Sequence, residues 1–145
     1  MISRRTMVLT GSGAIIGGAI FYGRRWPSFA GLNIDAPTAH ADAVARRILL
    51  IDIRRPDEWQ ATGVGEGAIP LDMRRDDFTA ALAALMPPGQ TCPVALICAR
   101  GVRSARLATA MTRAGQTHVI NVPEGMLGAA AGPGWIARGL PLQTA

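Results

Sequence analysis

A short apolar run that leads directly into a cysteine and a helical pattern constrains the fold of this chain most strongly. Residues Val94–Ile97 are all apolar, as expected of a strand buried inside a parallel sheet. Cys98 ends the run, Gly101 follows three residues later, and residues 104–114 have helical spacing. A strand, a tight loop and a helix in this order place Cys98 near the N-terminus of a helix.

Such a position favours the thiolate form of a cysteine. The first N–H groups of a helix have no partner within the helix, and the helix dipole places partial positive charge there. The thiolate is the nucleophile in cysteine chemistry. The alternative for Cys98 is packing alone, because free cysteines are common in protein cores. The specific loop that follows Cys98 favours a nucleophile.

The segment Cys98-Ala99-Arg100-Gly101-Val102-Arg103-Ser104 resembles the active-site loop of the rhodanese family of sulfurtransferases, which reads Cys-x-x-Gly-x-Arg/Thr-Ser. Three other segments are similar to family signatures, in the family's order: Asp-x-Arg with Pro-Asp-Glu-Trp at 52–59, a Gly-Ala-Ile segment at 63–71, and Trp-x-x-x-Gly-x-Pro at 135–141. The similarity extends from about Leu32 to the C-terminus.

The resemblance implies an α/β fold, a three-layer sandwich in which helices flank a central parallel sheet. It also implies a sulfurtransferase in which Cys98 takes sulfur from a small donor, such as thiosulfate or polysulfide, and holds it as a persulfide. The acceptor would be a thiol or a cyanide-like molecule, with a protein acceptor as a further candidate. No cofactor and no metal are expected. The alternative is a partner-dependent sulfur carrier or binding module with little turnover alone.

The loop is expected to stabilise the thiolate, hold the persulfide and bind the anionic part of the donor. Backbone N–H groups of residues 99–103 can form an anion-binding nest, and Gly101 suits a crowded backbone position. Arg103 is the candidate for the donor's anionic group, and its alternative is a surface arginine paired with a carboxylate. Arg100 faces either the pocket mouth or solvent. Ser104 is expected to cap the helix.

Loop length argues against phosphate chemistry. Phosphatases and arsenate reductases of this kind of fold resemble Cys-x5-Arg, which from Cys98 would require arginine at position 104. That position is Ser104, and the nearest arginine, Arg103, is one residue too early. A shorter loop encloses a sulfur atom better than a tetrahedral oxyanion.

Asp52, Arg54 and Glu58 are predicted to form a structural network that ties a strand end to a helix start, and a catalytic carboxylate group is the alternative. Cys92 is expected to pack. It lies six residues before Cys98 on an extended segment of roughly 20 Å, which is too far for a disulfide. His40 and His118 are not expected to form a metal pair or to have a catalytic role.

The chain departs from the family pattern in three places. Val64 stands where the family has histidine, and Glu124-Gly125 replaces the usual Gly-Gly. Residues 126–134 are rich in glycine and alanine and form a long segment. These changes bear mainly on substrate preference.

The positive charge lies mainly at the N-terminus. All fifteen basic residues are arginine, and four of them lie in the first thirty residues, which contain no acidic residue. From Gly31 onward the remaining eleven face ten acidic residues. We therefore expect no nucleic-acid partner, and we expect the arginine pairs at 46–47, 54–55 and 74–75 to be solvated or ion-paired at the surface.

Residues 1–30 are predicted to be a signal peptide or N-terminal membrane anchor, and residues 31–145 a rhodanese-like domain. Arg4 and Arg5 resemble a twin-arginine export motif, and the apolar run at 7–22 is short of the roughly 20 residues of a membrane span. Cleavage after Ala30 is preferred to cleavage after Ala41. The expected location is the bacterial periplasm or the outer face of the inner membrane, with membrane contact only through this segment.

The remaining elements follow from hydrophobic spacing and from capping residues. Asp35 is expected to cap a helix and Gly115 to end one. Strands are predicted at 32–34, 48–53, 67–71, 94–97 and 118–122, and helices at 36–47, at 76–85 or 77–85, and at 104–114.

Overall fold

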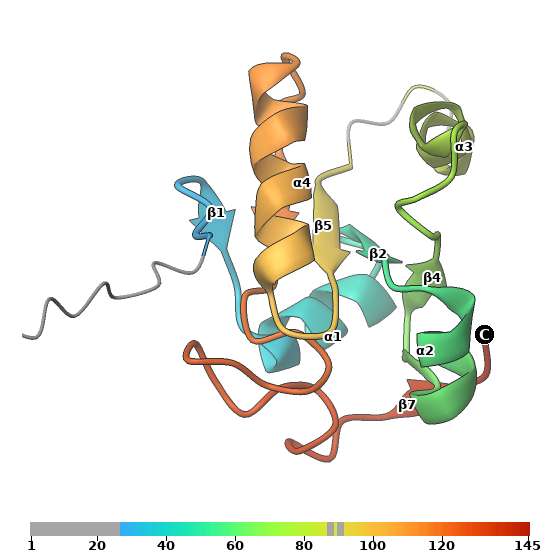
Figure 1. Ribbon diagram of the computed structural model, residues 1–145, viewed down its shortest axis with the longest axis vertical. Coiled ribbons are helices and arrows are strands. Elements are labelled where there is room, and N and C mark those ends of the chain that lie inside the picture. Colours follow the sequence, from blue (N-terminus) through green and yellow to red (C-terminus); the bar gives the residue numbers. More distant parts are fainter. Residues whose placement is uncertain (1–26, 87–88, 90–91) are drawn as a thin grey trace, which may run out of the picture.

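The computed structural model describes residues 27–86, 89 and 92–145 (Figure 1). The twin-arginine motif and the apolar run of the predicted leader or anchor lie outside these residues. None of the helices in the described ranges is long and apolar enough to span a membrane.

A five-stranded parallel sheet forms the centre of the fold, as predicted. Its order from edge to edge is β1-β6-β5-β2-β4, and Asp52 at the end of β2 is in register with Ile97 at the end of β5. The carboxyl ends of the two central strands therefore lie together, beside the Cys98 loop. The strands are β1 (Leu32–Asn33), β2 (Leu49–Asp52), β4 (Ala68–Pro70), β5 (Val94–Ile97) and β6 (Val119–Asn121).

The described residues form four helices: α1 (Ala36–Val44), α2 (Pro56–Thr62), α3 (Phe78–Leu85) and α4 (Val102–Arg113). Alternate residues of β5 belong to two separate core clusters. Ala95 and Ile97 pack with α1, whereas Leu96 and Cys98 pack with α3 and α4. These two cores on opposite faces of one sheet give the three layers that the sequence predicts.

The start of α4 differs from the prediction. The helix begins at Val102, two residues earlier than expected, and Gly101 is its N-cap residue in the left-handed region. Ser104 therefore lies inside the first turn, and the expectation that it caps the helix was wrong. Figure 1 shows the short loop that joins β5 to α4.

A second, antiparallel pair of strands was not predicted. β3 (Val64–Gly65) pairs with β7 (Leu142–Gln143), close to the C-terminus. Each strand has only two residues, which is too short for a periodic pattern in the sequence. The pair fixes the C-terminal segment beside α2.

Phe29 packs into the core before the predicted domain boundary at Gly31. Its ring is buried in the cluster that contains Cys98, and its carbonyl accepts a hydrogen bond of 3.0 Å from Asn33 Nδ2. Cleavage after Ala30 would therefore remove a core side chain.

We predict that Phe29→Ala lowers the free energy of unfolding by about 1–3 kcal/mol, the range for a buried side chain of this size. Leu32→Ala is the control, because Leu32 is exposed, and its effect should be within about 0.5 kcal/mol. Urea denaturation measures both. Equal effects of the two substitutions would show that Phe29 does not contribute to the core.

Candidate active site

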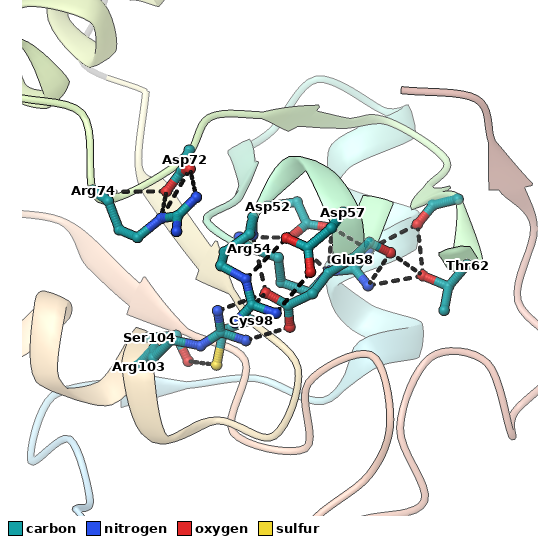
Figure 2. A network of polar contacts seen from close by, with 12 residues as sticks. Asp52, Arg54, Asp57, Glu58, Thr62, Asp72, Arg74, Cys98, Arg103 and Ser104 are labelled. Carbon is teal, nitrogen blue, oxygen red and sulfur yellow. Dashed lines mark hydrogen bonds and ion pairs between the residues drawn. The ribbon is translucent and has the colours of Figure 1, made fainter. Parts of the chain in front are cut away.

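Cys98 lies at the carboxyl end of β5 and is buried, with 1% of its surface exposed. Its thiol donates a hydrogen bond to Ser104 Oγ at 3.5 Å, and the Ser104 hydroxyl donates to the carbonyl of Gly101 at 3.1 Å. Figure 2 shows the sulfur beside this hydroxyl. Ser104 thus contacts the candidate nucleophile directly and does not cap the helix.

The loop that follows Cys98 has an unusual hydrogen-bond pattern. Within the part of the chain that the structure describes, no acceptor pairs with the backbone N–H groups of residues 99–103. Two carbonyls of the same loop are paired: Met126 N donates to Cys98 O at 2.9 Å, and Leu127 N donates to Ala99 O at 2.8 Å. Free N–H groups beside a helix N-terminus favour a bound anion.

The close packing around position 101 requires a glycine there. Its φ is +77°, and a Cβ built there would lie 1.9 Å from the carbonyl oxygen of Pro123. No other residue fits this contact without movement of the backbone. The Cys98 loop therefore lies directly against the segment that follows β6.

Gly125 makes a second close contact between the same two segments. A Cβ at this position would lie 2.6 Å from the carbonyl oxygen of Ala99. Only the second glycine of the family's Gly-Gly is present here, and it is the one that touches the loop.

Arg103 is paired with Glu58, which is the alternative that the sequence left open. Arg103 Nη1 donates to Glu58 Oε2 at 2.8 Å, and Nη2 donates to Oε1 at 2.6 Å (Figure 2). The hydrogen bonds from Arg103 hold the pKa of Glu58 below its ordinary value, and the same bonds raise the pKa of Arg103. The expected role of Arg103 toward a donor's anionic group stays a prediction.

Asp52 and Arg54 form a buried ion pair beneath the loop. Arg54 Nη2 lies 2.7 Å from Asp52 Oδ2 and also donates to Gly63 O at 2.7 Å. Its Nη1 donates to Thr62 Oγ1 at 2.8 Å. The pair connects the end of β2 to the C-terminal end of α2. Arg54 is only 1% exposed, so the expectation of a surface arginine was wrong at this position.

Glu124 holds the segment after β6 in place. Its carboxylate accepts hydrogen bonds from Ala36 N at 2.7 Å, Gly134 N at 2.8 Å and Arg138 Nε at 2.8 Å. Burial raises the pKa of this carboxyl, but the bonds from Arg138, Ala36 and Gly134 outweigh burial and lower it overall. The sequence showed Glu124 only as a departure from Gly-Gly, because its partners are distant in the chain.

Arg100 lines a cavity of about 500 Å³ on the side of the loop formed by Gly101 and Val102. Its Nη1 donates to the carbonyl of Gly128 at 3.2 Å. Arg100 is exposed, and the residues that line this cavity do not include Cys98, so both alternatives for Arg100 stay open. The cavity wall also includes Ala129, from the long Gly/Ala segment.

The other residues considered from the sequence lie away from the loop. Cys92 and Cys98 are both free, and the Cys92 thiol donates to the carbonyl of Arg47 at 3.5 Å. His40 contacts Glu66 at 2.7 Å. Among residues 27–86, 89 and 92–145, no group of three His, Cys, Asp or Glu side chains could hold a metal ion.

A sequence model of the rhodanese-like domain matches residues 36–131, which is most of the chain. The chain belongs to the rhodanese-like family. This match covers the β5–α4 loop, which contains Cys98 and Arg103. No curated protein matches the chain.

Solved structures share the rhodanese-like fold. Rv0390 from M. tuberculosis is 30% identical, with a TM-score of 0.61, and the match covers 81% of this chain and all of that one. The polysulfide-sulfur transferase homodimer of Wolinella succinogenes is 23% identical, with a TM-score of 0.59, and the match covers 79% of each chain. A protein from Rhodopseudomonas palustris described as a possible tyrosine phosphatase is 21% identical, with a TM-score of 0.57 and coverage of 77% and 84%.

We predict that Gly101→Ala destabilises this rhodanese-like domain more than Gly139→Ala does. Both glycines have positive φ, but Gly139 has open space around its Cβ position. The control should cost about 1–2 kcal/mol of unfolding free energy from backbone strain alone. Gly101→Ala must also displace the Pro123 carbonyl, so its cost should be clearly larger in urea denaturation. Equal costs would contradict the close contact.

We predict that Glu124→Gln removes a pH-dependent part of the stability. Because the folded pKa of Glu124 is lowered, its carboxylate stabilises the fold above the ordinary value of 4.5, and this contribution is lost as pH falls through the folded pKa. The parent should exceed the variant by about 1–3 kcal/mol at pH 7, and the difference should shrink below pH 4.5. Thermal or urea unfolding across this range measures it. A difference that stays constant with pH would contradict the prediction.

Proposed function

We propose that this protein is a sulfurtransferase that carries sulfane sulfur on Cys98 as a persulfide. The observation that carries the proposal is the set of N–H groups at residues 99–103, next to the Cys98 thiol, which have no acceptor within the described part of the chain. Such a loop stabilises negative charge on sulfur without a metal or a charged side chain. Membership of the rhodanese-like family supports the same chemistry.

The first half-reaction transfers one sulfur atom to Cys98. The thiol loses its proton to solvent, and the thiolate attacks the outer sulfur of the donor. A new S–S bond forms on Cys98 as the S–S bond of the donor breaks, and its electron pair leaves with the donor remnant. The remnant is sulfite from thiosulfate or a shortened chain from polysulfide.

The second half-reaction returns Cys98 to its starting state. A thiolate or cyanide attacks the outer sulfur of the persulfide, and the Cys98 thiolate leaves. The products are an acceptor persulfide or thiocyanate. No oxidant or reductant is consumed, because the sulfane sulfur keeps its oxidation level in both steps.

Ser104 fits a supporting role in both steps. When Cys98 is a thiol, the Ser104 oxygen accepts a hydrogen bond from Cys98 Sγ–H, and the Ser104 hydroxyl donates a hydrogen bond to Gly101 O. After deprotonation, rotation of this hydroxyl would let it donate to the sulfur anion. The hydroxyl can therefore serve both forms of Cys98 without movement of the backbone.

The burial of Cys98 favours a second candidate function, that of a sulfur carrier that depends on a partner protein. With 1% of the residue exposed, a donor reaches the sulfur only after the loop or Arg103 moves. A partner protein could supply this opening, as in a sulfur carrier that loads once and does not turn over alone. Multiple turnover with small reagents separates an enzyme from such a carrier.

We also propose that the protein works outside the cytoplasm, in the periplasm or on the outer face of the inner membrane. The support is the Arg4-Arg5 motif and the apolar run at 7–22. Cell fractionation of the full chain beside an Arg4→Gln, Arg5→Gln variant tests this proposal. Cytoplasmic recovery of the parent would contradict it.

The proposed function is tested by intact-protein mass spectrometry after exposure to thiosulfate and to polysulfide. We predict that the parent and Cys92→Ser gain one sulfur atom that cyanide removes, and that Cys98→Ser gains none. Cys92→Ser is the matched control because it removes the other thiol of the chain. Absence of a gain with both donors, or a gain on Cys98→Ser, would overturn the assignment of Cys98.

A further inference from the structure

The Arg103 guanidinium forms a two-pronged contact with the Glu58 carboxylate at the edge of the candidate active-site loop. Both terminal nitrogens of Arg103 donate to Glu58, one to each oxygen, at 2.8 and 2.6 Å. In Figure 2 the guanidinium lies beside the Cys98 sulfur and points to Glu58. A thiolate at Cys98 contributes to the raised pKa of Arg103, after the larger effects of Glu58. The guanidinium therefore lies close enough to the sulfur to be affected by its charge.

Glu58 is held in place from its own helix. Its Oε2 also accepts from the backbone N–H of Arg55 at 3.0 Å, in a capping-box contact at the start of α2. The Arg55 guanidinium lies further away, at 3.8 Å. The carboxylate is thus fixed on α2, whereas Arg103 reaches it across the gap from α4.

This geometry has an electrostatic consequence for any anion that approaches Cys98. A donor such as thiosulfate would bind the same two N–H edges of Arg103 that Glu58 occupies. It would also meet the negative charge of Glu58, which stays in place through its contact with Arg55. An uncharged reagent does not compete with Glu58 for Arg103, and the negative charge of Glu58 does not repel it.

We propose that Glu58 is a specificity-determining residue that neutralises Arg103 and slows the reaction of Cys98 with small dianionic sulfur donors, relative to donors of lower charge. The favoured donors are organic or protein persulfides, whose charge is low or distant from the reacting sulfur. The preference for a class of sulfur donor rests on the proposed function. The dependence of Cys98 reactivity on the charge of a reagent does not, and it can be measured separately.

The test compares two alkylating reagents on the full chain. Iodoacetate is anionic and iodoacetamide is neutral, and in both the Cys98 thiolate attacks carbon and iodide leaves. The measured quantity is the ratio of the iodoacetate rate to the iodoacetamide rate at Cys98, from mass spectrometry of the Cys98 peptide. Cys92 in the same molecule provides an internal reference, because it lies away from the Arg103–Glu58 pair.

We predict that Glu58→Gln raises this ratio about three- to tenfold, as expected for removal of one negative charge within a few ångströms of the reacting group. Glutamine keeps the capping contact with Arg55, so the helix should be preserved. Arg103→Gln should lower the ratio, because the negative charge of Glu58 is then no longer neutralised.

Asp57→Asn is the matched control. It removes the same charge one residue away, from a carboxylate that pairs with Arg55, and should change the ratio less than twofold.

An unchanged ratio in Glu58→Gln, or an equal rise of both rates, would overturn the proposal, because it would mean that Glu58 only packs or holds the loop. A similar rise in Asp57→Asn would also overturn it, since a general surface charge would then explain the effect.

Loading with thiosulfate on the same variants separates this inference from the proposed function. A shifted alkylation ratio without sulfur loading from thiosulfate, polysulfide or an organic persulfide would support the role of Glu58 and contradict the sulfurtransferase.

Discussion

The active-site loop depends on a backbone contact that leaves no room for a side chain. Gly101 lies against the carbonyl of Pro123, and Gly125 lies against the carbonyl of Ala99. Between these points, N–H groups of the segment after β6 pair with the loop carbonyls. The Cys98 and Ala99 carbonyls are thereby paired, whereas the N–H groups of residues 99–103 have no acceptor among the described residues. These donors beside a buried thiol are the physical support for the anionic sulfur chemistry that we propose at Cys98.

Three arginine–carboxylate pairs hold the parts around this loop. Asp52–Arg54 fixes β2 to α2, Glu124–Arg138 fixes the segment after β6, and Glu58–Arg103 joins α2 to α4. Each carboxylate is largely buried and each contact is 2.6 to 2.8 Å. Arginine suits these places because its planar fork matches a carboxylate and stays charged when partly buried. The absence of lysine from the chain is consistent with this use.

The parts of the fold that depend on neighbouring residues could be predicted from the sequence. The strand Val94–Ile97 and the position of Cys98 after it follow from local pattern, and the order of strands and helices gave the parallel sheet. The start of α4 could not be placed, because the left-handed Gly101 is set by its contact with Pro123. The partner of Arg103 was hidden for a similar reason, since Glu58 is 45 residues away. The burial of Phe29 likewise depends on packing against distant parts of the chain.

The most direct test of this account is a crystal structure of the protein after reaction with polysulfide. The account predicts an outer sulfur on Cys98 that lies inside the loop and accepts hydrogen bonds from N–H groups of residues 99–103. An outer sulfur that points away from the loop, with those N–H groups unengaged, would contradict the claim that the loop holds anionic sulfur.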